Sequence, residues 1–167
     1  MKKVILNLAQ TYDGYISRLD GTVDYLEQFG SGNQKQFDRF LSKIDTVIMG
    51  RTTYDEYNKY GWDHLKGKRI IVLTTKIGSS NEVEFYSGDL IKLVKSIDKN
   101  IWCFGGAKVI TSFLEANLID EFQITTVPKI IGKGKRVFEF GDYDFDLKLI
   151  EIIRDESVIT NIYEVVK

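Results

Sequence analysis

Short apolar runs alternate with amphipathic segments along the first two thirds of the chain. Apolar and β-branched residues predict strands over residues 4–9, 46–49, 69–73, 83–86 and 101–104. Between them, apolar residues spaced three and four apart predict helices over residues 34–43, 51–57, 89–97 and 108–115. Because parallel neighbours in a sheet need helical crossovers, this alternation predicts a largely parallel sheet covered on both faces.

The last third of the chain has a different pattern. Its β-rich runs cover residues 122–127, 146–153 and 158–166, with no helical pattern between them. The polar turn Arg154-Asp155-Glu156-Ser157 predicts that the last two runs form an antiparallel hairpin. The expected architecture is therefore α/β, with a mostly parallel but mixed sheet that ends in a C-terminal hairpin.

Composition narrows the class of protein. A chain of 167 residues with 43% hydrophobic content fits one globular domain over residues 1–167. Its 23 basic and 24 acidic residues form no long block of one sign, which argues against a general nucleic-acid binder. No apolar run approaches the length of a membrane span, and no cleavage site follows the short apolar start, so we expect a cytoplasmic protein.

Two residues bear on metal and redox chemistry. Cys103 is the single cysteine, lies inside an apolar run, and is expected to be a buried thiol in a reducing compartment. His64 is the single histidine and has no cysteine or second histidine at metal-ligand spacing. We therefore expect a surface imidazole and no metal site.

Two strand ends carry residues that suit phosphate groups. After the strand at 46–49, Gly50 permits close backbone approach, Arg51 supplies a cation, and Thr52 and Thr53 supply hydroxyls at a helix start. After the strand at 101–104, Gly105-Gly106 opens another helix. Two such turns on one sheet can hold one dinucleotide. The alternatives are an ordinary helix cap at the first turn and a plain tight connection at the second.

The residues before the first helix read as a loop. Asp13-Gly14 and Asp20-Gly21 are turn dipeptides, and Gly30-Ser31-Gly32-Asn33 is glycine-rich. We expect the segment from Asp13 to Gly32 to exclude water from a bound ligand.

Several short segments together resemble one known family. They are Tyr12-Asp13-Gly14-Tyr15-Ile16-Ser17, Asp20-Gly21 with Asp24-Tyr25-Leu26, Val47-Ile48-Met49-Gly50-Arg51-Thr52-Thr53-Tyr54, Phe104-Gly105-Gly106-Ala107, Leu118-Ile119-Asp120-Glu121-Phe122, and 128–134 with Phe138. In that order they are similar to the dihydrofolate reductase-like proteins, in particular small bacterial ones akin to the reductase domain of riboflavin biosynthesis. The resemblance spans nearly the whole chain and implies a three-layer fold and a homodimer.

The resemblance also implies NADPH as cofactor. Arg51, Thr52 and Thr53 would hold its 2′-phosphate and pyrophosphate next to Gly50. Thr74, Thr75 and Lys76 would line the adenosine side. The remaining cofactor residues implied by the resemblance are Ala9, Ile16 and Ser17 near the nicotinamide, and Gly105, Gly106, Ala107, Lys108 and Val109 at the second phosphate region.

One departure from the family concerns the proton donor. Dihydrofolate reductases use a carboxylate on the first helix, whereas a gapless count back from Gly50 places Gln34 there, with Asp38 one turn later. Asp38 is a candidate acid if the helix register shifts, although a solvent-facing charge is the alternative. Thr126 falls where the family bonds substrate or a water.

The resemblance therefore implies an NADPH-dependent reductase that transfers hydride to a small heterocycle or a ribosylamino-pyrimidine-type substrate. The alternative is a non-catalytic NADP-binding or regulatory protein that keeps the cofactor cleft, which the amide at Gln34 would permit.

Overall fold

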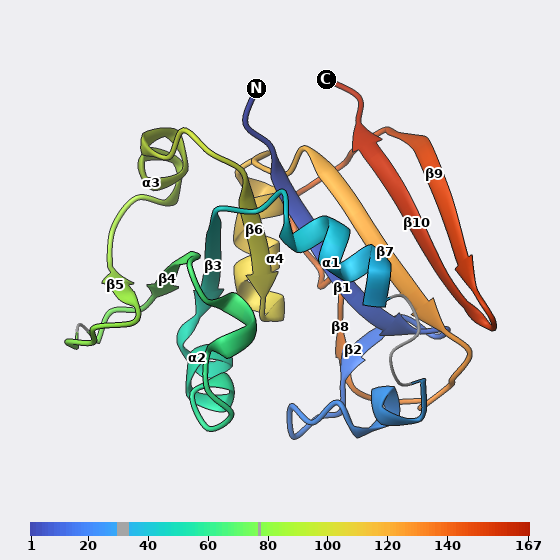
Figure 1. Cartoon of the computed structure of the whole chain (residues 1–167). Coiled ribbons are helices and arrows are strands. Elements are labelled where there is room, and N and C mark those ends of the chain that lie inside the picture. The colour runs from blue at the N-terminus through green and yellow to red at the C-terminus, as the bar shows by residue number, and fades with distance from the viewer. Residues whose placement is uncertain (30–33, 77) are drawn as a thin grey trace.

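The fold is built on one eight-stranded mixed sheet (Figure 1). The computed structural model describes residues 1–29, 34–76 and 78–167, so the glycine-rich segment 30–33 lies outside the described residues. The strands follow the order β5-β4-β3-β6-β1-β7-β10-β9. The parallel members are β1 (Val4–Thr11), β3 (Thr46–Gly50), β4 (Arg69–Leu73), β5 (Glu84–Tyr86), β6 (Ile101–Gly105) and β7 (Glu121–Val127).

The C-terminal hairpin extends the sheet on one side. It consists of β9 (Leu147–Asp155) and β10 (Val158–Val165), and β10 pairs antiparallel with both β7 and β9. A second, two-stranded antiparallel sheet joins β2 (Tyr15–Ser17) to β8 (Lys135–Arg136).

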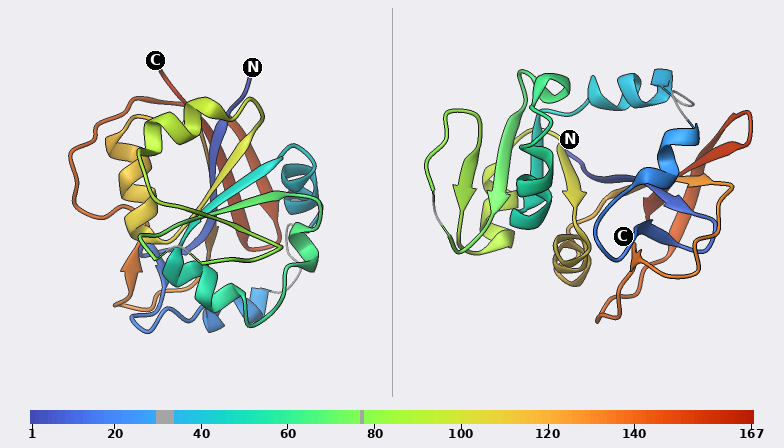
Figure 2. Two further views of the ribbon diagram at one scale, coloured as in Figure 1. Left: turned by 90° about the vertical axis from the view of Figure 1, so that its left-hand side faces the viewer. Right: turned by 90° about the horizontal axis from the view of Figure 1, so that it is seen from below.

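Helices lie on both faces of the large sheet. They are α1 (Gln34–Leu41), α2 (Arg51–Tyr57), α3 (Leu90–Ser96) and α4 (Ala107–Glu115), with the 3-10 helices η1 (Asp24–Phe29) and η2 (Asp63–Leu65). Figure 2 shows α1 on one side of the sheet and α4 on the other. The three layers that the resemblance implies are therefore present.

Each face of the sheet has its own apolar core. On the α4 side, Leu6 and Ile48 pack with Ile110 and Phe113. On the α1 side, Phe40 of α1 meets Trp102 of β6 edge-on, with ring centroids 5.0 Å apart. Alternation along the strands separates the two cores, because successive side chains of a strand point to opposite faces.

The α/β class, the mixed sheet and the terminal hairpin are confirmed. The predicted strands and helices are all found, with ends displaced by one or two residues. For example, the first helix ends at Leu41 instead of residue 43, and the first strand continues to Thr11. The sequence did not predict β2, β8 or the two 3-10 helices. They are short, and β2 is held by pairing with a segment more than a hundred residues later, which no local pattern encodes.

The parallel strands all end at one edge of the sheet. This edge lies at the bottom of Figure 1, and both chain termini lie at the opposite edge. Thr11, Gly50, Leu73, Gly105 and Val127 are therefore the last residues of strands that finish side by side. Ligands of open α/β sheets bind beyond this edge.

Candidate functional site

The two glycine turns predicted from the sequence are neighbours in space. They follow β3 and β6, which are adjacent strands, and Met49 is paired with Gly105. A Cβ atom built on Gly106 would lie 3.4 Å from Oγ1 of Thr53, at the start of α2. One built on Gly50 would lie 3.0 Å from Cγ2 of Val109, in the first turn of α4. Each turn therefore packs against the helix start that follows the other.

Glycine is required at Gly105 by its backbone conformation. Its φ is +116°, a region that side chains with a Cβ atom rarely adopt, and the Gly105-Gly106 peptide bond is cis. Gly106 is the N-cap of α4 and Gly50 is the N-cap of α2. Among the described residues no side chain caps either helix, so the first-turn amides of both helices point toward this edge without a side-chain acceptor.

Most of the predicted phosphate residues lie at this junction. The side chain of Thr53 is half-buried against Gly106, and Ala107 is buried. Thr52 and Lys108 are exposed in the first turns of their helices.

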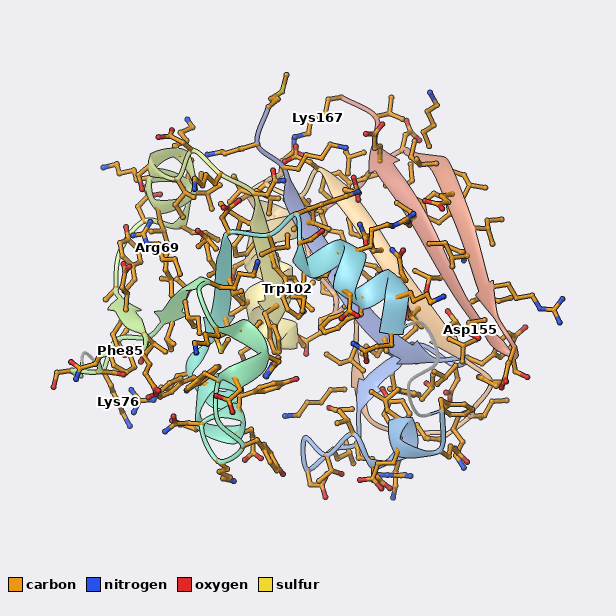
Figure 3. The ribbon with its side chains drawn as sticks, viewed as in Figure 1. Arg69, Lys76, Phe85, Trp102, Asp155 and Lys167 are labelled. Atoms are coloured by element: carbon orange, nitrogen blue, oxygen red, sulfur yellow. The ribbon has the colours of Figure 1, made fainter. Side chains whose placement is uncertain are left out.

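Arg51 links the start of α2 to the loop after β4. Its Nε donates to Asp55 at 3.0 Å, and its Nη1 donates to the carbonyl oxygen of Lys76 at 3.1 Å. The guanidinium carbon also lies 5.4 Å from the ring centroid of Phe85. Figure 3 shows Phe85 and Lys76 at this end of the sheet. The structure thus brings Arg51 together with the segment 74–76, as the resemblance implies.

Within that segment, Thr74 shapes the loop. Its amide donates to the carbonyl of Tyr86, and its Oγ1 accepts a hydrogen bond from the amide of Lys76. Thr75 and Lys76 are exposed.

Ala9 faces the α1 side of the sheet, near the carboxyl end of β1. It is paired with Thr125 of β7. The α1-side core contains Ile5 on β1 and Trp102 on β6, so strand alternation places Asn7 and Ala9 on that same face. Figure 3 shows Trp102 beside α1.

Thr126 lies on the other face. Its neighbour Ile124 packs against the α4-side core, and Thr126 accepts a hydrogen bond of 3.3 Å from Gln10. Thr125 is the threonine that shares a face with Ala9, and its hydroxyl is 2.8 Å from that of Thr160. The face alternation therefore brings Thr125, and not Thr126, beside Ala9.

Polar amide side chains line the α1 face on the amino-terminal side of Ala9. Gln123 is only 3% exposed, and its Oε1 accepts from Asn7 at 3.0 Å and from Gln36 of α1 at 3.5 Å. Its Nε2 donates to Glu121 at 2.6 Å. Glu121 in turn pairs with Lys3 at 2.9 Å. Hydrogen bonds to Glu164 and Glu121 raise the pKa of Lys3 above its ordinary value.

Gln36 is therefore the residue of α1 whose polar group reaches β7, whereas Arg39 reaches Glu151 of β9. Asp38 is exposed, and its carboxylate accepts a hydrogen bond of 2.8 Å from Gln34. Neither Gln34 nor Asp38 makes a described contact with Ala9. The amide cluster of Asn7, Gln36 and Gln123 was not predicted, because only packing determines which side of an eight-residue helix faces the sheet.

The first loop is tied to the segment after β7. Asp13 accepts hydrogen bonds from the hydroxyl of Thr11 and from the amide of Gly132. The bond from Thr11 is the main cause that lowers the pKa of Asp13. Ile16 lies in β2, and its carbonyl accepts from the hydroxyl of Tyr25 at 2.7 Å, while Ser17 is buried. Ile16 and Ser17 are thereby fixed near the end of β1, since β1 and β2 are in contact.

The described part of the chain contains neither a metal-binding cluster nor a membrane-spanning helix. Over residues 1–29, 34–76 and 78–167, no group of three or more His, Cys, Asp or Glu side chains could hold a metal ion. No helix in these ranges is long and apolar enough to cross a membrane. His64 is exposed in η2, and burial raises the pKa of the Cys103 thiol.

Comparison with known proteins identifies the family. The family model of the RibD C-terminal domain matches residues 2–160. The chain belongs to this family. Among curated proteins, it is 30% identical to the uncharacterized protein YyaP of Bacillus subtilis (strain 168) over 166 residues, which is 89% of this chain and 87% of that protein. It is also 30% identical to the uncharacterized protein YwjB of the same organism, over 82% of this chain and 83% of that protein.

Solved structures share the fold. A putative riboflavin biosynthesis protein from Shewanella sp. PV-4 superposes with a TM-score of 0.88 at 23% identity, covering 99% of both chains. Dihydrofolate reductase from Enterococcus faecalis, complexed with NADP(H), superposes with a TM-score of 0.73 at 18% identity, covering 99% of this chain and 97% of that one. Proteins named as reductases therefore occur among the structural neighbours, and the predicted dihydrofolate reductase-like fold is confirmed.

Proposed function

We propose that this protein is an NADPH-dependent reductase of a small, flat heterocycle or an open-chain sugar imine. The observation that carries the proposal is the junction of the two glycine turns, where Gly50 and Gly106 each pack against the other helix start. A Cβ at either position would fill the space through which a pyrophosphate approaches the backbone. The neighbour complexed with NADP(H) supports the same cofactor.

The residues at the junction suit the parts of the cofactor. Amides at the starts of α2 and α4 would bind the pyrophosphate, together with the hydroxyls of Thr52 and Thr53. Arg51 and the segment 74–76 would bind the adenosine 2′-phosphate, because Arg51 keeps donors beyond those used by Asp55 and Lys76. Ala9, Ile16 and Ser17 would border the nicotinamide. When bound, NADPH supplies the hydride.

The substrate would lie over Ala9, on the α1 side of the sheet. Thr125 and the half-buried amides of Asn7 and Gln36 offer both donors and acceptors there, and the buried amide of Gln123 holds these two amides in place. Amide groups of this kind suit a neutral ring edge that carries C=O and N–H groups. A carboxylate such as that of dihydrofolate reductases would instead select a ring edge made of donors.

Asp38 is the carboxylate that α1 offers as a proton donor. Because Asp38 is exposed and bonded to Gln34, we expect the turnover of Asp38→Asn to stay within about tenfold of the unaltered protein. Removal of a general acid would instead lower turnover roughly 10²–10⁴-fold. A loss in the larger range would assign the proton to Asp38.

The proposal is tested by cofactor binding followed by turnover. Purified protein is titrated with NADPH and with NADH by fluorescence, and is then offered dihydrofolate and ribosylamino-pyrimidine substrates while the absorbance of the reduced cofactor is followed. We expect tighter binding of NADPH than of NADH, and oxidation of NADPH with a pyrimidine substrate. Binding without turnover on any substrate would favour a non-catalytic NADP-binding or regulatory protein, and no binding would contradict both functions.

A further inference from the structure

A row of aromatic side chains crosses the α1 side of the sheet. It begins with Phe37 of α1, whose ring centroid lies 5.9 Å from that of Trp102 on β6. The ring centroid of Phe104 lies 4.5 Å from that of Trp102 and 4.8 Å from that of Tyr57, the last residue of α2. α1 and the residues that follow α2 lie on the side of the sheet opposite α4 (Figures 1 and 2). The row therefore links α1 to α2 across β6.

This aromatic row lies beside the place where the substrate is proposed to bind. The indole Nε1 of Trp102 donates a hydrogen bond of 3.0 Å to the carbonyl oxygen of Asn7 on β1. The pairing of β1 with β6 ends just before Asn7 and Phe104, and both side chains lie on the α1 side. Ala9 follows Asn7 by two residues on the same face. Tyr57, which packs edge-on against Phe104, is thus a neighbour of the substrate position over Ala9.

Three of the four rings in the row are open to a ligand. Trp102 is buried, whereas Phe37, Phe104 and Tyr57 are each half-buried, so parts of these three rings remain accessible. Aromatic walls with few polar groups are typical of small-molecule sites, and flat rings stack favourably on them. A polar group within such a wall is therefore expected to contact the substrate.

Tyr57 supplies that polar group. Within residues 1–29, 34–76 and 78–167, its phenol hydroxyl has no hydrogen-bond partner. No buried side-chain oxygen or nitrogen in these ranges lacks a partner, so this hydroxyl is not sealed inside the core. Burial of the ring raises the pKa of the Tyr57 phenol above its ordinary value of 10.0, so the hydroxyl keeps its proton at neutral pH.

Other groups near the substrate position are less suited to give up a proton. Reduction of a C=N or C=O bond needs a proton as well as a hydride. Asp38 is exposed and accepts a hydrogen bond from Gln34. The hydroxyl of Thr125 is engaged with that of Thr160, and amide side chains are not acids. Tyr57 offers an unengaged, protonated and accessible hydroxyl instead.

We propose that Tyr57 is the proton donor of the reduction, with its hydroxyl bonded to the nitrogen or oxygen of the double bond that is reduced. This inference rests on the proposed function. The substrate carbon accepts the hydride that NADPH supplies, and the electron pair of the C=N or C=O bond moves to the nitrogen or oxygen. That atom takes the hydroxyl proton of Tyr57, and the phenolate left behind regains a proton from water.

The first test compares Tyr57→Phe with Tyr54→Phe. Tyr54 loses the same hydroxyl one turn earlier on α2, where its ring stacks on Trp62 at 5.7 Å. With NADPH and the ribosylamino-pyrimidine, Tyr57→Phe should lower the single-turnover rate roughly 10²–10⁴-fold, the range for loss of a general acid. Tyr54→Phe should leave this rate nearly unaltered. Circular dichroism and the affinity for NADPH should not change in either variant.

Replacement of Tyr57 by a fluorinated tyrosine of nearly the same size separates a chemical role from a structural one. The fluorinated phenol is more acidic, so the alkaline fall of the single-turnover rate should move to lower pH. The same replacement at Tyr54 should leave the pH profile unchanged. In the absence of cofactor, the fluorine NMR resonance of position 57, and not that of position 54, should shift when the ribosylamino-pyrimidine is added.

The outcomes separate this proposal from the proposed function. If the unaltered protein reduces the pyrimidine but Tyr57→Phe keeps the rate, or the fluorinated protein keeps the pH profile, only the role of Tyr57 is overturned. If the unaltered protein reduces neither dihydrofolate nor the pyrimidine, the proposed function is contradicted and the proton-donor role falls with it. The fluorinated protein also decides the matter if Tyr57→Phe fails to fold.

Discussion

Gly50 packs closely against Val109, because a Cβ atom built on Gly50 would lie only 3.0 Å from Cγ2 of Val109. The φ of Gly50 is −84° and its ψ is 166°, which any residue adopts. A larger residue at position 50 is therefore opposed by the contact and not by the backbone. The contact joins the turn after β3 to helix α4, which is the junction to which we assign the cofactor phosphates.

The first prediction follows from this contact. Gly50→Ala should lower the free energy of unfolding by about 1–3 kcal/mol, the usual cost of an extra methyl group in a packed site. Valine is stiff about χ1 and cannot turn its methyl groups aside. In a Val109→Ala background the same change should cost clearly less. Urea unfolding of the two single variants and the double variant measures this coupling. Additive effects would show that the contact does not govern the junction.

The glycine turns could be predicted because their signals are local. An apolar run that ends in glycine and is followed by a helical pattern places Gly50 and Gly105 at strand ends without knowledge of the rest of the fold. Parallel pairing then brings these ends to one edge. That β3 and β6 are immediate neighbours depends on strand order, which the apolar pattern does not determine.

The substrate side was harder to predict for a physical reason. Thr125 and Thr126 are adjacent, both are half-buried, and only the packing of Ile124 on the α4 side determines which faces Ala9. In the same way, Gln34, Gln36 and Asp38 are all polar residues of one short helix, and contact with Gln123 distinguishes Gln36. A one-residue difference in a strand reverses the face of a side chain.

The second prediction separates the two threonines. Under the proposed function, Thr125→Val should lower turnover at least about tenfold, because it removes a hydroxyl beside Ala9 that can bond the substrate. Thr126→Val makes the same chemical change one residue later on the opposite face and should leave turnover nearly unaltered. Steady-state assays of the two variants make the comparison. A larger loss for Thr126→Val would restore Thr126 as the substrate-binding residue.

The third prediction concerns Tyr25 and alkaline pH. Burial raises the pKa of its phenol to about 12 from an ordinary value of 10.0, and its hydroxyl donates to the carbonyl of Ile16. The unfolded chain therefore loses this proton at lower pH than the folded protein. The stabilisation that comes from the raised pKa of the Tyr25 phenol is complete below about pH 10 and is lost as the pH rises toward 12.

Urea unfolding at several pH values between neutral and strongly alkaline measures this dependence. Tyr25→Phe should be less stable than the unaltered protein at neutral pH, because the bond to Ile16 is lost, and should lose less stability on going to high pH. Tyr12→Phe is the matched control, since Tyr12 is 75% exposed, and should keep the alkaline slope. Identical slopes for Tyr25→Phe and the unaltered protein would contradict the prediction.

The last prediction tests the role of Arg51. Its guanidinium is held by Asp55, by the carbonyl of Lys76 and by the ring of Phe85, so it is already oriented at the edge where the adenosine would lie. If it binds the 2′-phosphate, Arg51→Ala should weaken the binding of NADPH by roughly 1.5–3 kcal/mol, the scale of a hydrogen bond to a charged group, and should change the binding of NADH little.

Arg51→Lys should recover only part of the loss, because an ammonium cannot form the two parallel bonds of a guanidinium. Lys59→Ala, which removes an exposed cation paired with Glu56 beyond the other end of α2, should affect neither cofactor. Fluorescence titration of the unaltered protein and the three variants with each cofactor measures these affinities, and equal losses for NADPH and NADH would mean that Arg51 only supports the loop through Lys76.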